Sequence, residues 1–214
     1  MQKVSNAQLI EKAVSLLNNN TVSSVLGWQK GEFDYDITPK LFKDEKSLKE
    51  GFVYSDFCGI NLSKYLVAKT REAEGKILVF LKPCDTYSFN QLLTEHRFDR
   101  EKVYVVGVPC EGMVDIGKVK SYVADGISSI VSEDKLVVNT IYGDSVSLDY
   151  NNVLLEKCVS CKSKKHFSYD ELIPEVDGED VKENGRFDMV EKLEAMTPEE
   201  RFAFWQQQLS KCIR

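Results

Sequence analysis

The sequence predicts an α/β protein with a mixed sheet, built on a central parallel strand–helix–strand unit and completed by a small β-meander and C-terminal helices. Three observations predict this class. Two short apolar runs, 76–81 and 103–108, lie on either side of a helical pattern at 85–96. Residues 127–150 form three short strand-like segments separated by turns. The chain also begins and ends with segments that have the apolar spacing of amphipathic helices.

The first helix is expected over residues 6–20, with Ser5 or Asn6 as its N-cap. Its apolar residues recur at helical spacing: Leu9, Ile10, Ala13, Val14, Leu16 and Leu17. Short strands are predicted at 22–28 and 33–37, and a second helix at 61–73.

The central unit places two cysteines in equivalent positions. A strand–helix–strand of this length makes a right-handed crossover between parallel strands. Each strand runs into proline, cysteine and an acidic residue: Pro83-Cys84-Asp85 and Pro109-Cys110-Glu111. If the strands are neighbours, the two thiols share the rim at which ligands of such sheets usually bind. Asp85 can also cap the helix, which would place Cys84 where the helix dipole stabilises a thiolate.

The rest of the chain divides at an acidic, glycine-containing stretch. A meander is predicted at 127–131, 135–141 and 145–148, and Cys158-Val159-Ser160-Cys161 follows it. Residues 175–185 read as a linker or exposed loop, and Thr197 begins the last helix with a capping-box pattern. We therefore predict an α/β domain at 1–174 that includes the cysteine site, followed by a linker and C-terminal helix at 175–214.

The composition of the chain argues against nucleic-acid-binding and membrane-spanning proteins. The 214 residues are 43% hydrophobic and 29% charged, as in an ordinary soluble domain. A net charge of −6 argues against nucleic-acid binding. No apolar stretch approaches the roughly 18–20 residues that span a bilayer, and the N-terminal segment has no apolar signal core. A cytoplasmic location, and with it a reducing environment, is expected.

In a reducing compartment the six cysteines indicate metal or redox chemistry rather than disulfides. A CxxC supplies two ligands and needs two more, so we predict a metal site of Cys84, Cys110, Cys158 and Cys161. Spacing alone leaves both a 4Fe–4S cluster and structural zinc open. Cys58 is interpreted as a buried apolar residue. Surface or capping roles are expected for His96 and His166.

The sequence resembles the beta-subunit family of deazaflavin-reducing hydrogenases and formate dehydrogenases. The residues that carry the resemblance are Gly27-Trp28 with Lys30-Gly31, Lys-Pro-Cys-Asp at 82–85, Thr94-Glu95 with Arg100-Glu101, and Gly-Val-Pro-Cys-Glu-Gly-Met-Val-Asp at 107–115. More closely, the chain is similar to relatives that carry a 4Fe–4S dicluster ferredoxin tail. In those relatives a segment like 204–214 continues into ferredoxin-type cysteine repeats, which are missing here, so that Cys212 resembles the first ligand of an unfinished site.

The resemblance implies an electron-transfer subunit or domain of an anaerobic iron–sulfur oxidoreductase. It favours a 4Fe–4S cluster over zinc and suggests FAD as a further cofactor, for which no residues can be assigned. The implied partners are a ferredoxin-like domain or protein and a dehydrogenase, hydrogenase or heterodisulfide reductase subunit. The alternative is a non-catalytic zinc or dithiol scaffold that docks a redox partner.

Overall fold

A computed structural model describes residues 4–123, 125–161, 164–175, 177–179, 187–210 and 212 of the chain. The chain divides into two compact units, residues 1–181 and 182–214. Among the described helices, none is both long enough and apolar enough to cross a lipid bilayer.

The first unit is built on a five-stranded mixed sheet, which confirms the predicted α/β class. The strands are β1 (Ser24–Lys30), β2 (Ile37–Phe42), β3 (Ile77–Leu81), β4 (Val103–Gly107) and β8 (Glu171–Leu172), in the order β2-β1-β3-β4-β8. β1 pairs with β2 antiparallel, whereas the β1–β3, β3–β4 and β4–β8 pairs are parallel. The predicted parallel strand–helix–strand unit is therefore the centre of the sheet.

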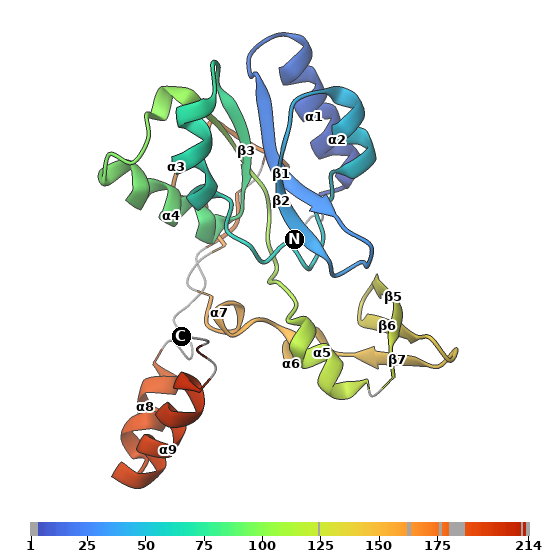
Figure 1. The fold of residues 1–214 in the computed structure, drawn as a ribbon, viewed down its shortest axis with the longest axis vertical. Coiled ribbons are helices and arrows are strands. Elements are labelled where there is room, and N and C mark those ends of the chain that lie inside the picture. The colour runs from blue at the N-terminus through green and yellow to red at the C-terminus, as the bar shows by residue number, and fades with distance from the viewer. Residues whose placement is uncertain are drawn as a thin grey trace. The chain divides into compact units, whose positions relative to one another are not determined.

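Helices cover both faces of this sheet. α1 (Asn6–Asn18) and α2 (Glu45–Gly51) lie on one side, and α3 (Ser63–Glu72) and α4 (Pro83–Thr94) on the other (Figure 1). Because both faces are covered, all five residues of β3 are buried, as expected for a central parallel strand. α1 begins as predicted, with a capping box at Ser5.

Several predicted boundaries were wrong. β1 spans Ser24–Lys30, where the sequence predicted a strand at 22–28, and α1 ends at Asn18 rather than at residue 20. β2 begins at Ile37, where the sequence predicted a strand at 33–37. Its Pro39 is tolerated because β2 is an edge strand, whose backbone need not donate on both sides. α4 begins at Pro83, so Asp85 lies in its first turn and is not the cap. Proline suits the first helical position, because the amide it lacks would have no partner there.

The predicted meander is confirmed as a separate antiparallel sheet. β5 (Ile127–Ser132), β6 (Leu136–Thr140) and β7 (Ser145–Leu148) pack with α5 (Ile116–Tyr122) and α6 (Tyr150–Val153) around a second apolar core. The backbone N–H of Ile130 donates to Asp34 Oδ2 at 3.0 Å. This bond ties the meander to the turn between β1 and β2. The sequence did not predict α2, α5 or the 3₁₀ turn Arg100–Lys102.

The second unit consists of α8 (Asp188–Ala195), which the sequence did not predict, and α9 (Pro198–Leu209). Thr197 forms the predicted capping box. Both helices expose apolar side chains, namely Met189, Val190, Phe202, Trp205 and Leu209. Cys212 is exposed. Most of the predicted linker 175–185 lies outside the described residues.

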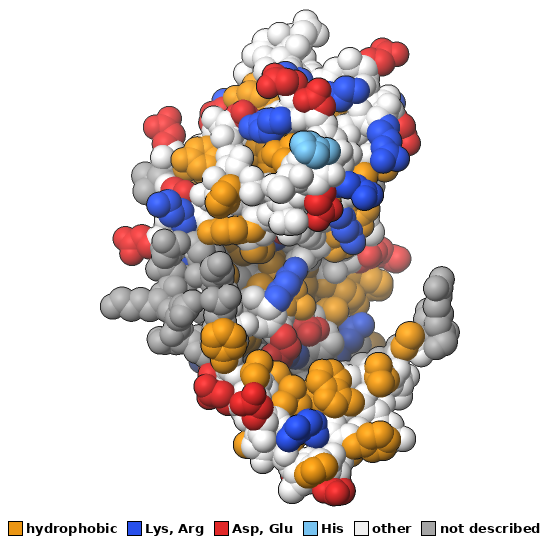
Figure 2. All heavy atoms as spheres, turned by 90° about the vertical axis from the view of Figure 1, so that its left-hand side faces the viewer, with side chains coloured by type: hydrophobic (Ala, Val, Ile, Leu, Met, Phe, Trp, Pro, Cys, Tyr) orange, Lys and Arg blue, Asp and Glu red, His pale blue; other side chains and the backbone are white. Residues whose placement is uncertain are grey.

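On the face drawn in Figure 2, acidic and basic side chains of the first unit are interspersed.

Candidate functional site

The two Pro-Cys turns leave the sheet at the same edge. β3 and β4 pair in register, with Leu81 opposite Gly107, and the Val108 N–H donates to the Leu81 carbonyl at 2.9 Å. The segments that follow β3 and β4 therefore both leave the sheet at the carboxyl ends of these strands, on the same edge. This confirms the expectation that the segments carrying Cys84 and Cys110 are neighbours.

A third cysteine reaches this edge from the short helix α7 (Glu156–Val159). The Met113 N–H donates to Cys158 Sγ at 3.4 Å, and the Leu155 N–H donates to the Met113 carbonyl at 2.8 Å. These bonds hold α7 against the loop that follows Cys110. Gly112 lies in that loop with φ +133°, and a Cβ there would come within 2.8 Å of Leu154. We call the region that carries Cys84, Cys110 and Cys158 the cysteine rim.

The cysteine rim brings segments together without forming a ready coordination sphere. Within the described residues, no three Cys, His, Asp or Glu side chains are arranged so that they could hold a metal ion. None of the six cysteines is in a disulfide; Cys84 is exposed, and Cys110, Cys158 and Cys161 are half-buried. The predicted four-cysteine ligand set therefore stays a prediction.

Electrostatics couple the thiols of the rim. Cys84 is exposed as a residue, but protein atoms crowd one side of its sulfur; this partial loss of water raises the thiol pKa, and the Asp85 carboxylate acts in the same direction. Burial likewise raises the pKa of Cys110 to about 11. The Cys110 thiolate contributes to the raised pKa of Cys84, and the Cys158 thiolate to that of Cys110. Cys84 and Cys158 are thus both within electrostatic range of Cys110, and a metal would have to displace protons to bind.

Nearby lysines lower the pKa values of the same thiols. The ammonium of Lys82 lowers the pKa of both Cys84 and Cys110, Lys157 acts on Cys84, and Lys164 acts on Cys110. Lys164 Nζ donates to the Cys110 carbonyl at 2.9 Å. Lys157 Nζ donates to the carbonyl of Gly59 at 2.6 Å. The basic residues that flank the CxxC in the sequence therefore stand at the rim, where they would offset thiolate charge.

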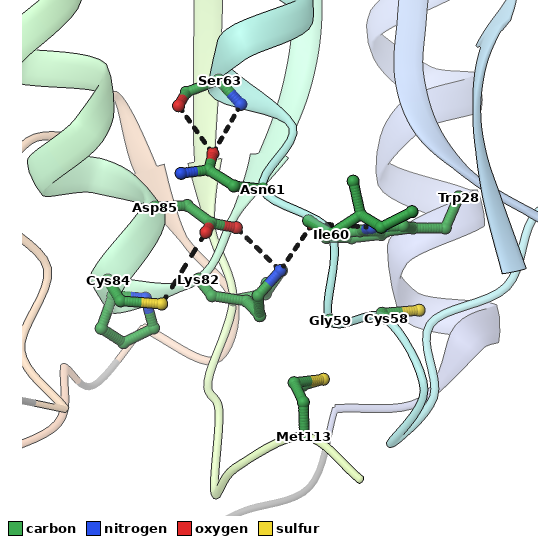
Figure 3. Close-up of polar contacts among 12 residues, drawn as sticks. Trp28, Cys58, Gly59, Ile60, Asn61, Ser63, Lys82, Cys84, Asp85 and Met113 are labelled. Carbon is green, nitrogen blue, oxygen red and sulfur yellow. Dashed lines mark hydrogen bonds and ion pairs between the residues drawn. The ribbon is translucent and has the colours of Figure 1, made fainter. Parts of the chain in front are cut away.

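Lys82 is the most enclosed of these cations, because its side chain is only 1% exposed. Its Nζ lies 2.7 Å from Asp85 Oδ2 and donates to the Ile60 carbonyl at 3.2 Å. The ammonium also lies over the Trp28 ring, 4.6 Å from the ring centroid. Cys84 Sγ donates to the other carboxylate oxygen of Asp85, Oδ1, at 3.7 Å. Figure 3 shows Asp85 between Cys84 and Lys82.

His166 is buried, in contrast to the surface or capping role expected of it. Nδ1 lies 2.6 Å from Asp177 Oδ1, and Nε2 lies 3.1 Å from the Val108 carbonyl. The backbone N–H of His166 also donates to the Asp177 carboxylate at 3.1 Å, so Asp177 holds both the ring and the main chain of this residue. The segment packs tightly over β4: a Cβ at Gly107 would lie 2.6 Å from Leu172 and 2.9 Å from His166. His96, by contrast, is exposed as expected.

A cleft of about 620 Å³ opens beside Cys110, between the main sheet and the meander. Its lining includes four carboxylate residues, Asp56, Glu111, Glu133 and Asp134, and no lysine or arginine of the part of the chain that the structure describes. These carboxylates disfavour an anionic group at this part of the cleft. The loop at the mouth is fixed by Tyr54, whose OH donates to the Pro109 carbonyl at 2.6 Å.

Sequence reasoning missed Lys82, Trp28 and Tyr54 as parts of the site. Lys82 gives one signal, since it directly follows five apolar residues and precedes a helix-starting proline. A lysine at the end of a buried strand must either extend its ammonium to solvent or pair it with a polar group inside the protein. Trp28 and Tyr54 lie in distant segments, so only the tertiary structure brings them to the rim.

Comparisons with known proteins agree with this fold. No known family model matches the sequence. The chain is similar to the F420-dependent formate dehydrogenase subunit beta of Methanocaldococcus jannaschii, with 31% identity over 99 residues. That match covers 46% of this chain and only 26% of that protein. Among solved structures, a chain of the F420-reducing [NiFe] hydrogenase complex from Methanosarcina barkeri matches with a TM-score of 0.55 and 15% identity, over 74% of this chain and 63% of that one. The chain therefore has weak similarity in part of its sequence to an F420-dependent formate dehydrogenase beta subunit, and it shares the fold of a chain in an F420-reducing hydrogenase complex.

Proposed function

We propose that this chain is an electron-transfer subunit or domain of an iron–sulfur oxidoreductase, in which Cys84, Cys110, Cys158 and Cys161 hold a 4Fe–4S cluster. The observation that carries the proposal is the convergence at one sheet edge of two strand-end cysteines and the first cysteine of the CxxC. Thiolates at the carboxyl ends of parallel strands are soft ligands in the usual position for a bound group.

The surroundings of the thiols support a cluster. Cys158 Sγ accepts a hydrogen bond from the Met113 N–H, and a backbone hydrogen bond from Gly112 lowers the pKa of Cys110. Backbone N–H groups directed at sulfur are one of the means by which proteins tune iron–sulfur reduction potentials. Lys82, Lys157 and Lys164 supply positive charge to offset four thiolates. When bound, the cluster would accept and release one electron at a time.

The names of the similar proteins support a role within a larger complex. One is a subunit of a formate dehydrogenase, and the other belongs to a hydrogenase complex. We therefore propose that electrons pass through the cysteine rim between a dehydrogenase, hydrogenase or heterodisulfide reductase subunit and a ferredoxin-like domain or protein, in the cytoplasm of an anaerobe. FAD is a further cofactor that the resemblance suggests, and we assign no residues of this chain to it.

Metal analysis of protein purified and reconstituted without oxygen tests the proposal. We expect about four iron and about four sulfide per chain, with visible absorption that bleaches on reduction. Cys→Ser changes at positions 84, 110, 158 and 161 should each abolish the intact cluster. Cys212→Ser is the matched control, because this exposed cysteine belongs to the second unit and should leave the cluster unchanged.

Two results would contradict the proposal. An iron-free wild-type protein after reconstitution would exclude the cluster. About one zinc per chain without iron would support the alternative, a structural scaffold that docks a redox partner. If any single serine variant kept a complete cluster, the four-cysteine ligand set would be wrong.

A further inference from the structure

The second unit does not bury its own apolar side chains. Among its described residues neither α8 nor α9 has a buried one, and Leu193, Met196 and Phe204, the least exposed apolar residues, are only half-buried. The two helices have eight and twelve residues, and isolated helices shorter than about 12–15 residues are marginal in water. Units below about 40 residues usually need disulfides, a metal or association with another chain. The second unit therefore requires a further apolar surface to pack against.

Local bonds nevertheless give this unit a defined form. Arg201 Nη2 donates to the carbonyls of Glu194 and Met196, at 3.4 and 2.9 Å, and so ties α9 to the end of α8. The capping box at Thr197 fixes the start of α9. Because these bonds orient α9 against α8, the side chains that α9 exposes belong to one fixed face of the unit.

Three large side chains form an apolar stripe along α9. Phe202, Trp205 and Leu209 are 70%, 49% and 70% exposed. Their spacing of i, i+3 and i+7 places them on one side of an α-helix. The same spacing forms the seam through which helices pair side by side. On the face of α8 and α9 drawn in Figure 2, hydrophobic side chains gather. We call Phe202, Trp205 and Leu209 the α9 stripe.

The residues that border the α9 stripe carry no net charge. Glu199 and Arg201 flank its N-terminal half, and Gln206 and Gln208 flank its C-terminal half. A glutamine amide both donates and accepts hydrogen bonds, so it is compatible with the glutamine of an identical chain. A strongly basic or acidic partner would be matched by a border of the opposite sign. A neutral border of this kind favours a second copy of the same helix.

The exposed apolar area is also of the size that a dimer needs. Met189 and Val190 of α8 are 49% and 47% exposed and add to the three residues of the α9 stripe. Covering all five would remove on the order of 600 Å² per copy from water, since one fully buried aromatic side chain accounts for about 150–250 Å². Two copies together reach about 1,200 Å², the area at which specific protein–protein interfaces begin.

We propose that this chain forms a homodimer through its second unit, in which the α9 stripes of two copies pack against each other. The interface is isologous, because the same residues face each other across a twofold axis and the assembly closes at two copies. The two α8–α9 hairpins then bring four helices together and give each α9 the apolar cover that its own hairpin lacks. The inference goes beyond the proposed function and does not depend on a cluster at the cysteine rim.

Analytical ultracentrifugation of the full chain in reducing buffer tests this inference. Reducing conditions exclude a cross-link through the exposed Cys212. We expect the wild-type protein to sediment at twice the chain mass and to dissociate on dilution. Trp205→Glu places a charge in the middle of the α9 stripe and should weaken association about thirtyfold or more. Tyr142→Glu is the matched control, because Tyr142 is an aromatic residue of the first unit that is 75% exposed, and it should leave association unchanged.

Three results would overturn the inference. One is a wild-type protein that stays monomeric at about 100 µM, as it would if the first unit or another protein covered the α9 stripe. Another is a dimer that persists unchanged in Trp205→Glu, because its interface would then lie elsewhere. The third is an equal loss of association in Tyr142→Glu. Far-UV circular dichroism checks the helical content of each variant. If Trp205→Glu loses helix, Leu209→Glu in the last turn decides: loss of the dimer supports the inference, and an unchanged dimer refutes it.

Discussion

Replacing Lys82 with methionine should strongly destabilise the metal-free protein, because it leaves the Asp85 carboxylate buried without its counter-charge. The Asp85 side chain is only 2% exposed, so water cannot take the place of the ammonium. Removing one member of a buried ion pair typically costs about 3–5 kcal/mol of unfolding free energy. We expect the loss on Lys82→Met to fall in this range.

The contacts of the ammonium lead to a similar magnitude. A hydrogen bond from a charged donor, as to the Ile60 carbonyl at 3.2 Å, contributes about 1.5–3 kcal/mol. A desolvated cation over tryptophan, here 4.6 Å from the ring centroid, adds about 2 kcal/mol. These contributions share one group and are not additive. The double variant Lys82→Met/Asp85→Asn removes both charges, and it should be at least about 1 kcal/mol more stable than Lys82→Met.

Urea unfolding of the metal-free protein under reducing conditions measures these differences. The chain has two tryptophans, one in each unit, so a Trp205→Phe background leaves buried Trp28 as the fluorescent reporter of the first unit. Lys102→Met is the control: Lys102 also donates to a backbone carbonyl, that of Thr70, but it is exposed, so water can replace the ammonium and we expect a loss below about 1 kcal/mol. The reasoning is refuted if Lys82→Met is as stable as its parent, or if the double variant loses the sum of the two single losses.

Three further changes test the surroundings of the site. Gly107→Ala should destabilise by about 1–3 kcal/mol in urea unfolding, because the added methyl group has no space over β4; Gly51→Ala, whose Cβ would make only ordinary contacts, should be neutral. Tyr54→Phe should lose about 1 kcal/mol and release iron faster to a chelator, because it frees the loop that carries Cys110; an unchanged release rate would contradict that coupling. A backbone hydrogen bond from the meander, opposed by partial burial and aided by a nearby lysine, holds the pKa of Asp34 below its ordinary value. The ionised Asp34 therefore stabilises the fold above the usual aspartate pKa of about 3.9, and this stabilisation is lost as the pH falls through the lowered pKa. The difference in unfolding free energy between the parent and Asp34→Asn should vanish in acid. A difference that persists there would refute this reasoning.

Much of the architecture could be predicted from the sequence because it depends on local patterns. The apolar run at 77–81 predicted a central buried strand, the N-cap pattern at Ser5 or Asn6 predicted the start of the first helix, and the capping-box pattern at Thr197 predicted the start of the last. The errors arose where tertiary context overrides local preference. The strand at 37–42 contains Pro39, and proline in general disfavours a strand, but β2 lies at the sheet edge, where it is acceptable. α2 and α5 have only seven residues each, too few for a clear helical period.

For the site, the sequence by itself determined the residue types and their local positions. The two Pro-Cys ends and the CxxC are visible in the sequence itself. Parallel pairing of adjacent strands makes the meeting of the two Pro-Cys ends at one edge predictable. The buried charges beside them were decided only by the tertiary structure. Lys82 is a surface residue by type, and it becomes a buried cation because Trp28, from β1, and the Ile60 carbonyl, from the loop before α3, close over it. Contacts between segments so far apart in the chain depend on packing, which no local pattern records.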